Sequence, residues 1–170
     1  MKKKEIIKAK NKLKQVSKYT YLNYAKYACI LIIVLFLIYI GGIANIEKVS
    51  FEELLSNNAI VITGFMICTA NLYIWYVLKN FIKDIQQIEH IESIRINLML
   101  LVIGQFILMN FISSILMIIS LVKYFQWNSF SLKKALKEIK EDGQLSVLIV
   151  TLIVLVLFIS LVFGIYFSIT

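Results

Sequence analysis

The chain has 170 residues, of which 60% are hydrophobic and 16% are charged, and its formal net charge is +8. Soluble domains contain about 45 to 50% apolar and about 25% charged residues, and a chain of this composition folded in water would expose apolar patches that invite association. The composition therefore excludes an ordinary soluble domain and predicts a membrane protein, but it indicates neither a substrate nor a reaction.

The first predicted element is a basic segment over residues 1–23. Its apolar residues recur at steps of 3, 4 and 3, as on one face of a helix: Ile6, Ala9, Leu13 and Val16. We expect an amphipathic helix that contacts anionic lipid headgroups through Lys8, Lys10, Lys12 and Lys14. The alternative is a disordered tail that only sets the orientation of the chain. Binding to nucleic acid, which a basic run also allows, is not expected.

Gaps between charged residues locate the membrane spans. A helix of about 20 apolar residues crosses a hydrocarbon core of about 30 Å, and the uncharged stretches of this length predict an all-α membrane protein. Residues 24–170 are expected to form one membrane domain, a four-transmembrane-helix bundle with spans over about 27–46, 54–78, 96–122 and 145–169. The chain has no proline, which predicts continuous, unkinked helices.

The cations predict the orientation. Lysine-rich flanks stay cytoplasmic, so the nine lysines before the first span place the N-terminus inside. Four spans then place the C-terminus inside too, with 12 cations inside and 6 outside. A third segment that enters and returns would give 17 and 1, but it needs a shielded turn, and residues 96–122 contain only Gly104 to make one. We favour four spans and keep the re-entrant segment as the alternative.

Amphipathic segments are expected between the spans. Residues 131–142 predict an interfacial helix that begins at Ser131, with apolar residues at i, i+3, i+4 and i+7. Its lysines are expected to reach lipid headgroups: Lys133, Lys134, Lys137 and Lys140. The second loop, 79–95, has neither Gly nor Pro and is expected to stay helical, either as an extension of the second span or as a separate surface helix.

The predicted spans contain no Asp, Glu, Lys, Arg or His. Proton relays and coupled transporters place ionisable groups at depth, and hydrolases need a base or a metal. His90, the single histidine, lies between Glu89 and Glu92 in a spacing that does not match a zinc site. We therefore expect no enzyme, no cofactor and no metal site.

Neutral polar residues in the second and third spans are interpreted as interhelical hydrogen-bonding groups: Thr63, Asn71, Gln105, Asn110, Ser113 and Ser114. Counted at 1.5 Å per residue from their shared loop, Asn71 and Gln105 reach similar depths, so they are expected to pair. Cys29 and Cys68 differ in depth by about 12 Å. That difference exceeds the reach of a disulfide, and both are interpreted as small buried residues.

The fourth span carries a small-residue strip with a four-residue repeat: Ser160, Gly164 and Ser168. Such strips allow close helix packing, here against another helix of the chain, a second copy or a different protein. The bias towards Lys, Ile and Asn indicates a bacterial cell membrane as the location.

Together these features predict a small non-enzymatic membrane protein that acts by contact. It is expected to serve as an accessory subunit of a membrane complex or as a protein that protects against membrane-active toxins. The alternative is an oligomeric channel or small-solute carrier with a neutral polar path through Asn71, Gln105 and Asn110. Expected partners are membrane lipids with anionic headgroups, and another membrane protein or a second copy of the chain.

Overall fold

The computed structural model describes residues 21–169 except 88, 126 and 142–143. Within these residues every regular element is a helix, which confirms the predicted all-α class. The predicted amphipathic helix of the tail, with Lys8, Lys10, Lys12 and Lys14, lies outside the described residues.

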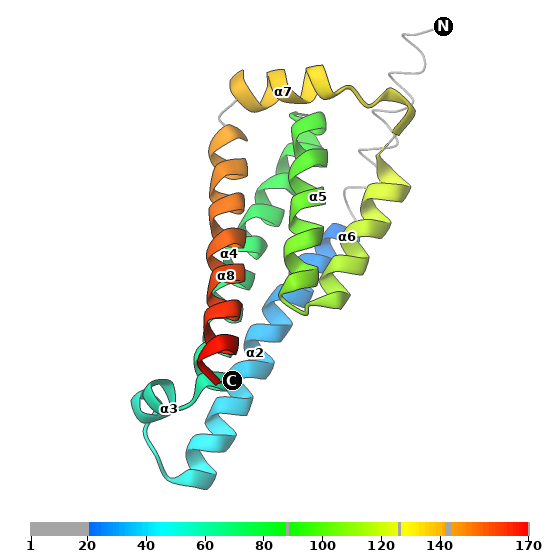
Figure 1. The fold of residues 1–170 in the computed structure, drawn as a ribbon. Coiled ribbons are helices and arrows are strands. Elements are labelled where there is room, and N and C mark those ends of the chain that lie inside the picture. Colours follow the sequence, from blue (N-terminus) through cyan, green and yellow to red (C-terminus); the bar gives the residue numbers. More distant parts are fainter. Residues whose placement is uncertain (1–20, 88, 126, 142–143, 170) are drawn as a thin grey trace, which may run out of the picture.

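The first two long helices form an antiparallel pair. Helix α2 (Tyr21–Glu47) leads through the short helix α3 (Phe51–Asn57) into α4 (Ala59–Gln87) (Figure 1). Both α2 and α4 are long and apolar enough to cross a membrane. Helix α4 continues through most of the predicted second loop, so that loop is an extension of the second span and not a separate surface helix.

The unbroken helix expected over 96–122 is not observed. Helix α5 (Ile91–Ile107) ends and α6 (Phe111–Tyr124) begins after three residues, and α6 runs back towards the end from which α5 came (Figure 1). The turn contains neither Gly nor Pro; Met109 adopts a left-handed backbone conformation, with φ 56°. The segment is therefore a helical hairpin, and we call residues 108–110 the hairpin tip.

The chain continues through the short helix η1 (Trp127–Ser129), α7 (Leu132–Glu141) and α8 (Gln144–Ile169). Helix α7 lies across one end of the helices, which we call the α7 end, and meets α8 at an angle of 97°. The opposite end, where α2 joins α3, is the α3 end. Counting α7 and α8 as one bent span raises the number of candidate membrane spans from two to three.

The first and last long helices, α2 and α8, both run towards the α3 end. The start of α2 meets the end of α6, where the rings of Tyr21 and Tyr124 stack with their centroids 5.9 Å apart. Helix α8 starts under α7 and runs towards the α3 end (Figure 1). The hairpin reverses the chain before α7, so residues 96–122 do not form the single continuous helix expected for the third span.

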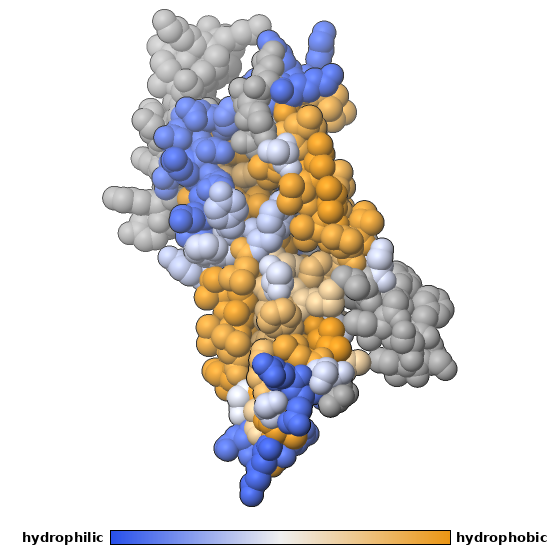
Figure 2. Space-filling model, turned by 90° about the vertical axis from the view of Figure 1, so that its left-hand side faces the viewer, coloured by the Kyte–Doolittle hydropathy of each residue, from blue (hydrophilic) through white to orange (hydrophobic). Residues whose placement is uncertain are grey.

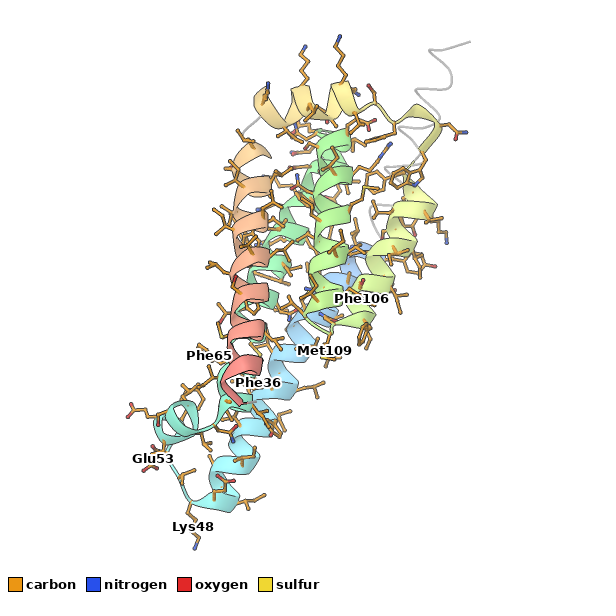
Figure 3. All side chains as sticks on the ribbon, in the orientation of Figure 1. Phe36, Lys48, Glu53, Phe65, Phe106 and Met109 are labelled. Atoms are coloured by element: carbon orange, nitrogen blue, oxygen red, sulfur yellow. The ribbon has the colours of Figure 1, made fainter. Side chains whose placement is uncertain are left out.

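The surface separates into polar ends and an apolar middle. Figure 2 shows hydrophilic side chains at both ends and on one flank near the α7 end, with hydrophobic side chains between them. Figure 3 places Phe106 and Met109 of the hairpin part-way between α7 and Lys48 at the α3 end. The hairpin therefore reaches into the apolar middle without passing through it.

Close helix approaches are made at two glycines. A Cβ atom at Gly64 of α4 would clash with the ring of Phe36 on α2, and one at Gly104 of α5 would clash with the side chain of Leu155 on α8. A Cβ atom at Gly41 of α2 would meet nothing within 4 Å. The first two glycines are therefore packing positions, whereas the third is open.

Replacing Gly64 by alanine is expected to lower the midpoint of thermal unfolding in detergent, followed by circular dichroism. The Phe36 ring has to move, and overpacking of this kind costs about 1 to 3 kcal/mol, which exceeds the gain in helix propensity of about 1 kcal/mol. Gly41→Ala is the matched control, because it has the gain in helix propensity without the clash. A Gly64→Ala midpoint equal to or above that of Gly41→Ala contradicts the packing role.

Candidate functional site

Interior polar side chains meet at the hairpin tip. Oδ1 of Asn71 on α4 accepts hydrogen bonds from Nε2 of Gln105 (3.2 Å) and from Nδ2 of Asn110 (2.9 Å). The Asn71 amide nitrogen donates to the carbonyl of Ile67 in its own helix, 2.9 Å away. All three amide side chains are at most 2% exposed. One acceptor atom thus couples α4 to both sides of the tip, and we call these three residues the amide cluster.

The tip bonds its own backbone. The turn residues donate their N–H groups to the last turn of α5: Leu108 to Gly104, Met109 to Phe106 and Asn110 to Gln105. The Asn110 side chain then caps α6 by accepting from the Ser113 N–H at 3.2 Å. A helix end normally leaves backbone groups without partners, and here the turn residues bond carbonyls at the end of α5 and an N–H group at the start of α6.

Two serines tie the second arm of the hairpin to its neighbours. The Ser113 hydroxyl donates to the carbonyl of Ala25 on α2 (3.3 Å) and lies 3.5 Å from the Cys29 sulfur. The Ser114 hydroxyl donates to the carbonyl of Val102 on α5, at 3.2 Å. Cys29 is therefore a polar contact as well as a small buried residue, a role that the sequence interpretation missed.

Thr63 and one atom of Gln105 differ from the other predicted polar groups in their hydrogen bonding. The Thr63 hydroxyl donates to the carbonyl of Ala59, at 2.8 Å, so its described hydrogen bond stays within α4 and does not involve the amide cluster. Oε1 of Gln105 is buried without a hydrogen-bond partner among the described residues. The described side-chain bonds of Gln105 and Asn110 to Asn71 are thus internal to the cluster, and one enclosed acceptor of Gln105 is left over.

Arg95 lies at the base of the hairpin, opposite its tip, where the start of α5 meets the residues that follow α6. It is 2% exposed, and its guanidinium carbon lies 5.1 to 5.5 Å from the ring centroids of three aromatic residues that follow α6: Phe125, Trp127 and Phe130. Its Nη1 lies 3.3 Å from a carboxylate oxygen of Glu92. We call Arg95 and the three aromatic residues the arginine clasp. Such cation–π contacts strengthen when water is excluded.

Burial acts against both charges of this pair. It raises the pKa of Glu92 above its ordinary value, an effect that Arg95 and Lys134 oppose, and it lowers the pKa of Arg95. Nε of Arg95 has no hydrogen-bond partner among the described residues, and Nη1 forms its ion pair with Glu92 without a hydrogen bond. The sequence interpretation counted Arg95 only as a loop charge. The aromatic residues at 125, 127 and 130 are the signal that could have indicated its enclosure.

Helix α7 is fastened to the start of α5. One carboxylate oxygen of Glu138 accepts from the backbone N–H groups of Glu92 (2.9 Å) and Ser93 (3.1 Å). A carboxylate at a helix N-terminus is favourable because it bonds free N–H groups and opposes the helix dipole. Glu138 also lies 3.6 Å from the ammonium of Lys134. These contacts fix α7 against the hairpin.

The four lysines of the predicted interfacial helix are all exposed on α7: Lys133, Lys134, Lys137 and Lys140. Of the predicted apolar stripe, Ala135 and Ile139 are buried, whereas Leu132 and Leu136 remain 63% and 55% exposed. The Ser131 hydroxyl accepts from the Lys134 N–H at 3.4 Å, as expected for a cap. Half of the stripe therefore packs on the protein and half faces outward.

The predicted close-packing strip on α8 stays a prediction. Ser160 is exposed, and the surroundings of Gly164 and Ser168 lie outside what the structure describes. In the described part of α8, the close approach is made instead by Leu155, over Gly104 of α5. The signal for that contact was the glycine in the third predicted span.

No metal site is found among the described residues: they contain no group of three His, Cys, Asp or Glu side chains that could hold an ion. His90 is the N-cap residue of α5 and adopts a left-handed backbone conformation, with φ 51°. Cys29 and Cys68 are both buried free thiols. The described arrangement can pack helices and present cations, and its polar interior is engaged in bonding itself.

Replacing Asn71 by leucine is expected to destabilise the protein by about 1 to 3 kcal/mol, because it leaves the buried amides of Gln105 and Asn110 without their shared acceptor. The measurement is the unfolding free energy in mixed micelles titrated with a denaturing detergent. The control is Thr69→Val on the same helix, since Thr69 is exposed and bonds only within α4. Equal stability of the two variants contradicts a packing role for the amide cluster.

Comparison of the chain with protein-family models, with curated proteins and with solved structures found no match. The function is therefore inferred from the groups that the fold brings together. These are the amide cluster, the arginine clasp and the lysine face of α7.

Proposed function

We propose that the chain is a non-enzymatic, multi-span membrane protein that acts by contact, either as an accessory subunit of a membrane complex or as an immunity-type protein against membrane-active toxins. The observation that carries this proposal is the buried amide cluster: Gln105 and Asn110 both donate to Asn71, and all three residues are at most 2% exposed. Amides used in this way hold helices together. The side chains that another molecule can contact then lie on the outer surface.

The lateral face of α2 supports action by contact. Leu31, Val34, Leu35 and Ile38 are between 45% and 67% exposed, and they follow the i, i+3, i+4, i+7 spacing of one helix face. In a membrane such a ridge meets lipid or the helix of another protein. A partner helix can therefore bind here without displacing any helix of the chain.

The rival proposal is an oligomeric channel or small-solute carrier. It requires the interior amides to line a water-filled path, because unpaired polar groups at depth are costly without water. Instead, the bonds from Gln105 and Asn110 to Asn71 are direct and short. This geometry supports the contact protein over the channel.

We also propose a membrane topology for the cell membrane, with the chain crossing three times, through α2, α4 and α8, and with the hairpin entering and leaving from one face. The stretch from Leu98 to Ile107 rises about 15 Å, half of a hydrocarbon core of about 30 Å. Irregular backbone at this depth is tolerated only when it is shielded, and the tip bonds its own N–H groups.

Side-chain polarity at the tip supports the same topology. Phe106, Met109 and Phe111 are between 45% and 73% exposed, whereas Gln105 and Asn110 face inward. The tip thus presents hydrocarbon outward, as lipid contact requires. This topology places 17 cations on the cytoplasmic side and only Lys48 on the other, in agreement with the positive-inside rule, and it places the N-terminus inside and the end of α8 outside.

Single cysteines at Lys137 on α7 and Lys48 at the α3 end test the topology. A membrane-impermeant maleimide is expected to label Lys48→Cys in intact cells and to label Lys137→Cys only after the cells are permeabilised. The unsubstituted chain is the control, since Cys29 and Cys68 are buried. Four spans predict labelling of both positions in intact cells, and that result contradicts the hairpin topology.

The contact function is tested by purification and by deletion. A tagged chain extracted in mild detergent is expected to bring down a stoichiometric membrane-protein partner, or deletion of the gene is expected to increase sensitivity to membrane-active peptides. Leu35→Trp, on the exposed face of α2, is expected to reduce the recovery of the partner or the protection against the peptides. Val122→Trp, 70% exposed on α6, serves as the control. Recovery of lipid alone together with unchanged sensitivity refutes the proposal.

A further inference from the structure

The long helices are distributed unequally along the molecule. Cys29 of α2 and Asn71 of α4 contact Asn110 at the hairpin tip. Beyond these two residues, α2 continues for about 27 Å and α4 for about 18 Å at 1.5 Å per residue. Helix α8 continues for about 21 Å past Leu155, which packs on Gly104 one turn before the tip. Among the described elements, α5 and α6 alone stop at the tip (Figure 1).

The molecule therefore has five long helices side by side between the tip and α7, and three beyond the tip. Side chains beyond the tip are uncovered to match. In the most apolar stretch of α2 only 11% of the residues are buried, against 33% in that of α4. Leu35, Leu37 and Ile38 of α2 are between 55% and 67% exposed. With Phe106 and Met109 at the tip, 62% and 73% exposed, they present hydrocarbon to the space beyond the hairpin (Figure 3).

The short helices at the two ends do not compensate for the hairpin. Helix α7 meets α8 at 97° and keeps Leu132 and Leu136 exposed, so it adds its own width at the α7 end. Helix α3 is shorter, with 7 residues against 10 in α7. It folds against α2 and α4 through Leu54, which is 3% exposed and packs with Ile40 and Val61.

The area that the hairpin takes from one leaflet follows from helix dimensions. A packed helix is about 10 Å across and occupies about 80 Å² in cross-section, so two helices displace about 160 Å² of lipid. The hairpin reaches about half-way through a hydrocarbon core of about 30 Å, so this area is lost from one leaflet only. The convex leaflet of a curved membrane has the greater area to fill. A protein of this shape therefore fits best where its wider half lies in the convex leaflet.

We propose that the chain acts as a membrane wedge, which favours curvature with the α7 end on the convex side. The inference rests on the proposed topology, because that topology places the α7 end in the cytoplasmic leaflet and stops the hairpin at half depth. The membrane around the chain then bulges towards the cytoplasm. The wedge goes beyond contact with a protein partner, since what it recognises is the curved lipid surface.

The test uses the full chain, reconstituted alone into giant vesicles of phosphatidylcholine and phosphatidylglycerol. A membrane-impermeant fluorescent maleimide is added from outside to Lys48→Cys or to Lys137→Cys, both at exposed positions. The first variant is labelled only where the α3 end faces outward, and the second only where the α7 end does. A thin membrane tube is then pulled from the vesicle, so that the outer leaflet is convex. The measurement is the tube-to-vesicle ratio of protein fluorescence, divided by that of a lipid dye.

Chains labelled at Lys137→Cys are expected to have a tube-to-vesicle ratio about threefold above that of chains labelled at Lys48→Cys, equivalent to about 0.65 kcal/mol. The two variants control for one another, because they differ only in the orientation that the dye selects. The difference is expected to shrink as the tube is made wider. Equal ratios in thin tubes, or enrichment of the chains whose α3 end faces outward, overturn the wedge.

Failure of the wedge can be told from failure of the proposed function. Labelling of both positions in intact cells rejects the topology and the wedge with it. Labelling of Lys48→Cys alone in intact cells, combined with equal ratios in tubes, keeps the topology and rejects the wedge. The vesicles contain only the chain and lipid, so a purification that recovers no protein partner refutes the contact function and not the wedge.

Discussion

A chain that reverses direction inside an apolar interior has to bond its own backbone polar groups, because no water is present to do so. At the hairpin tip the N–H groups of residues 108–110 return to α5, and the Asn110 side chain caps α6. Asn71 then holds the tip against α4. The direction of α6, the end at which α7 lies and the course of α8 all follow from this turn.

The spacing of apolar and charged residues is enough to predict the helices whose formation depends on residues close in sequence. The uncharged stretches locate α2 and α4, and the helical spacing of Leu132 to Ile139 locates α7 to within a residue at each end. Counting residues from a shared loop also puts Asn71 level with Gln105, and their side chains are bonded. This count works because both helices leave that loop without interruption.

The hairpin could not be predicted by the same means. A turn inside a span suggests Gly or Pro, yet the left-handed position is Met109, where a side chain costs about 1 to 2 kcal/mol. That cost is offset by the Asn110 cap and by the bond to Asn71, a residue 39 positions earlier. The cation count of 17 and 1 already favoured the reversal.

The arginine clasp was missed for a related reason. A charge between two predicted spans is normally assigned to solvent, and only the return of α6 brings Phe125, Trp127 and Phe130 back over Arg95. The clasp holds the base of the hairpin as the amide cluster holds its tip. A contact formed by reversal of the chain cannot be read from helical spacing, since its residues lie about 30 positions apart.

The reversal also decides which charged groups can act together. If the third segment crossed the membrane, Lys83 at the end of α4 and the lysines of α7 would lie on opposite faces. With the hairpin returning, α7 lies over the start of α5, fastened there by Glu138. The end of α4, which carries Lys83, and the lysines of α7 then lie at the same end of the molecule.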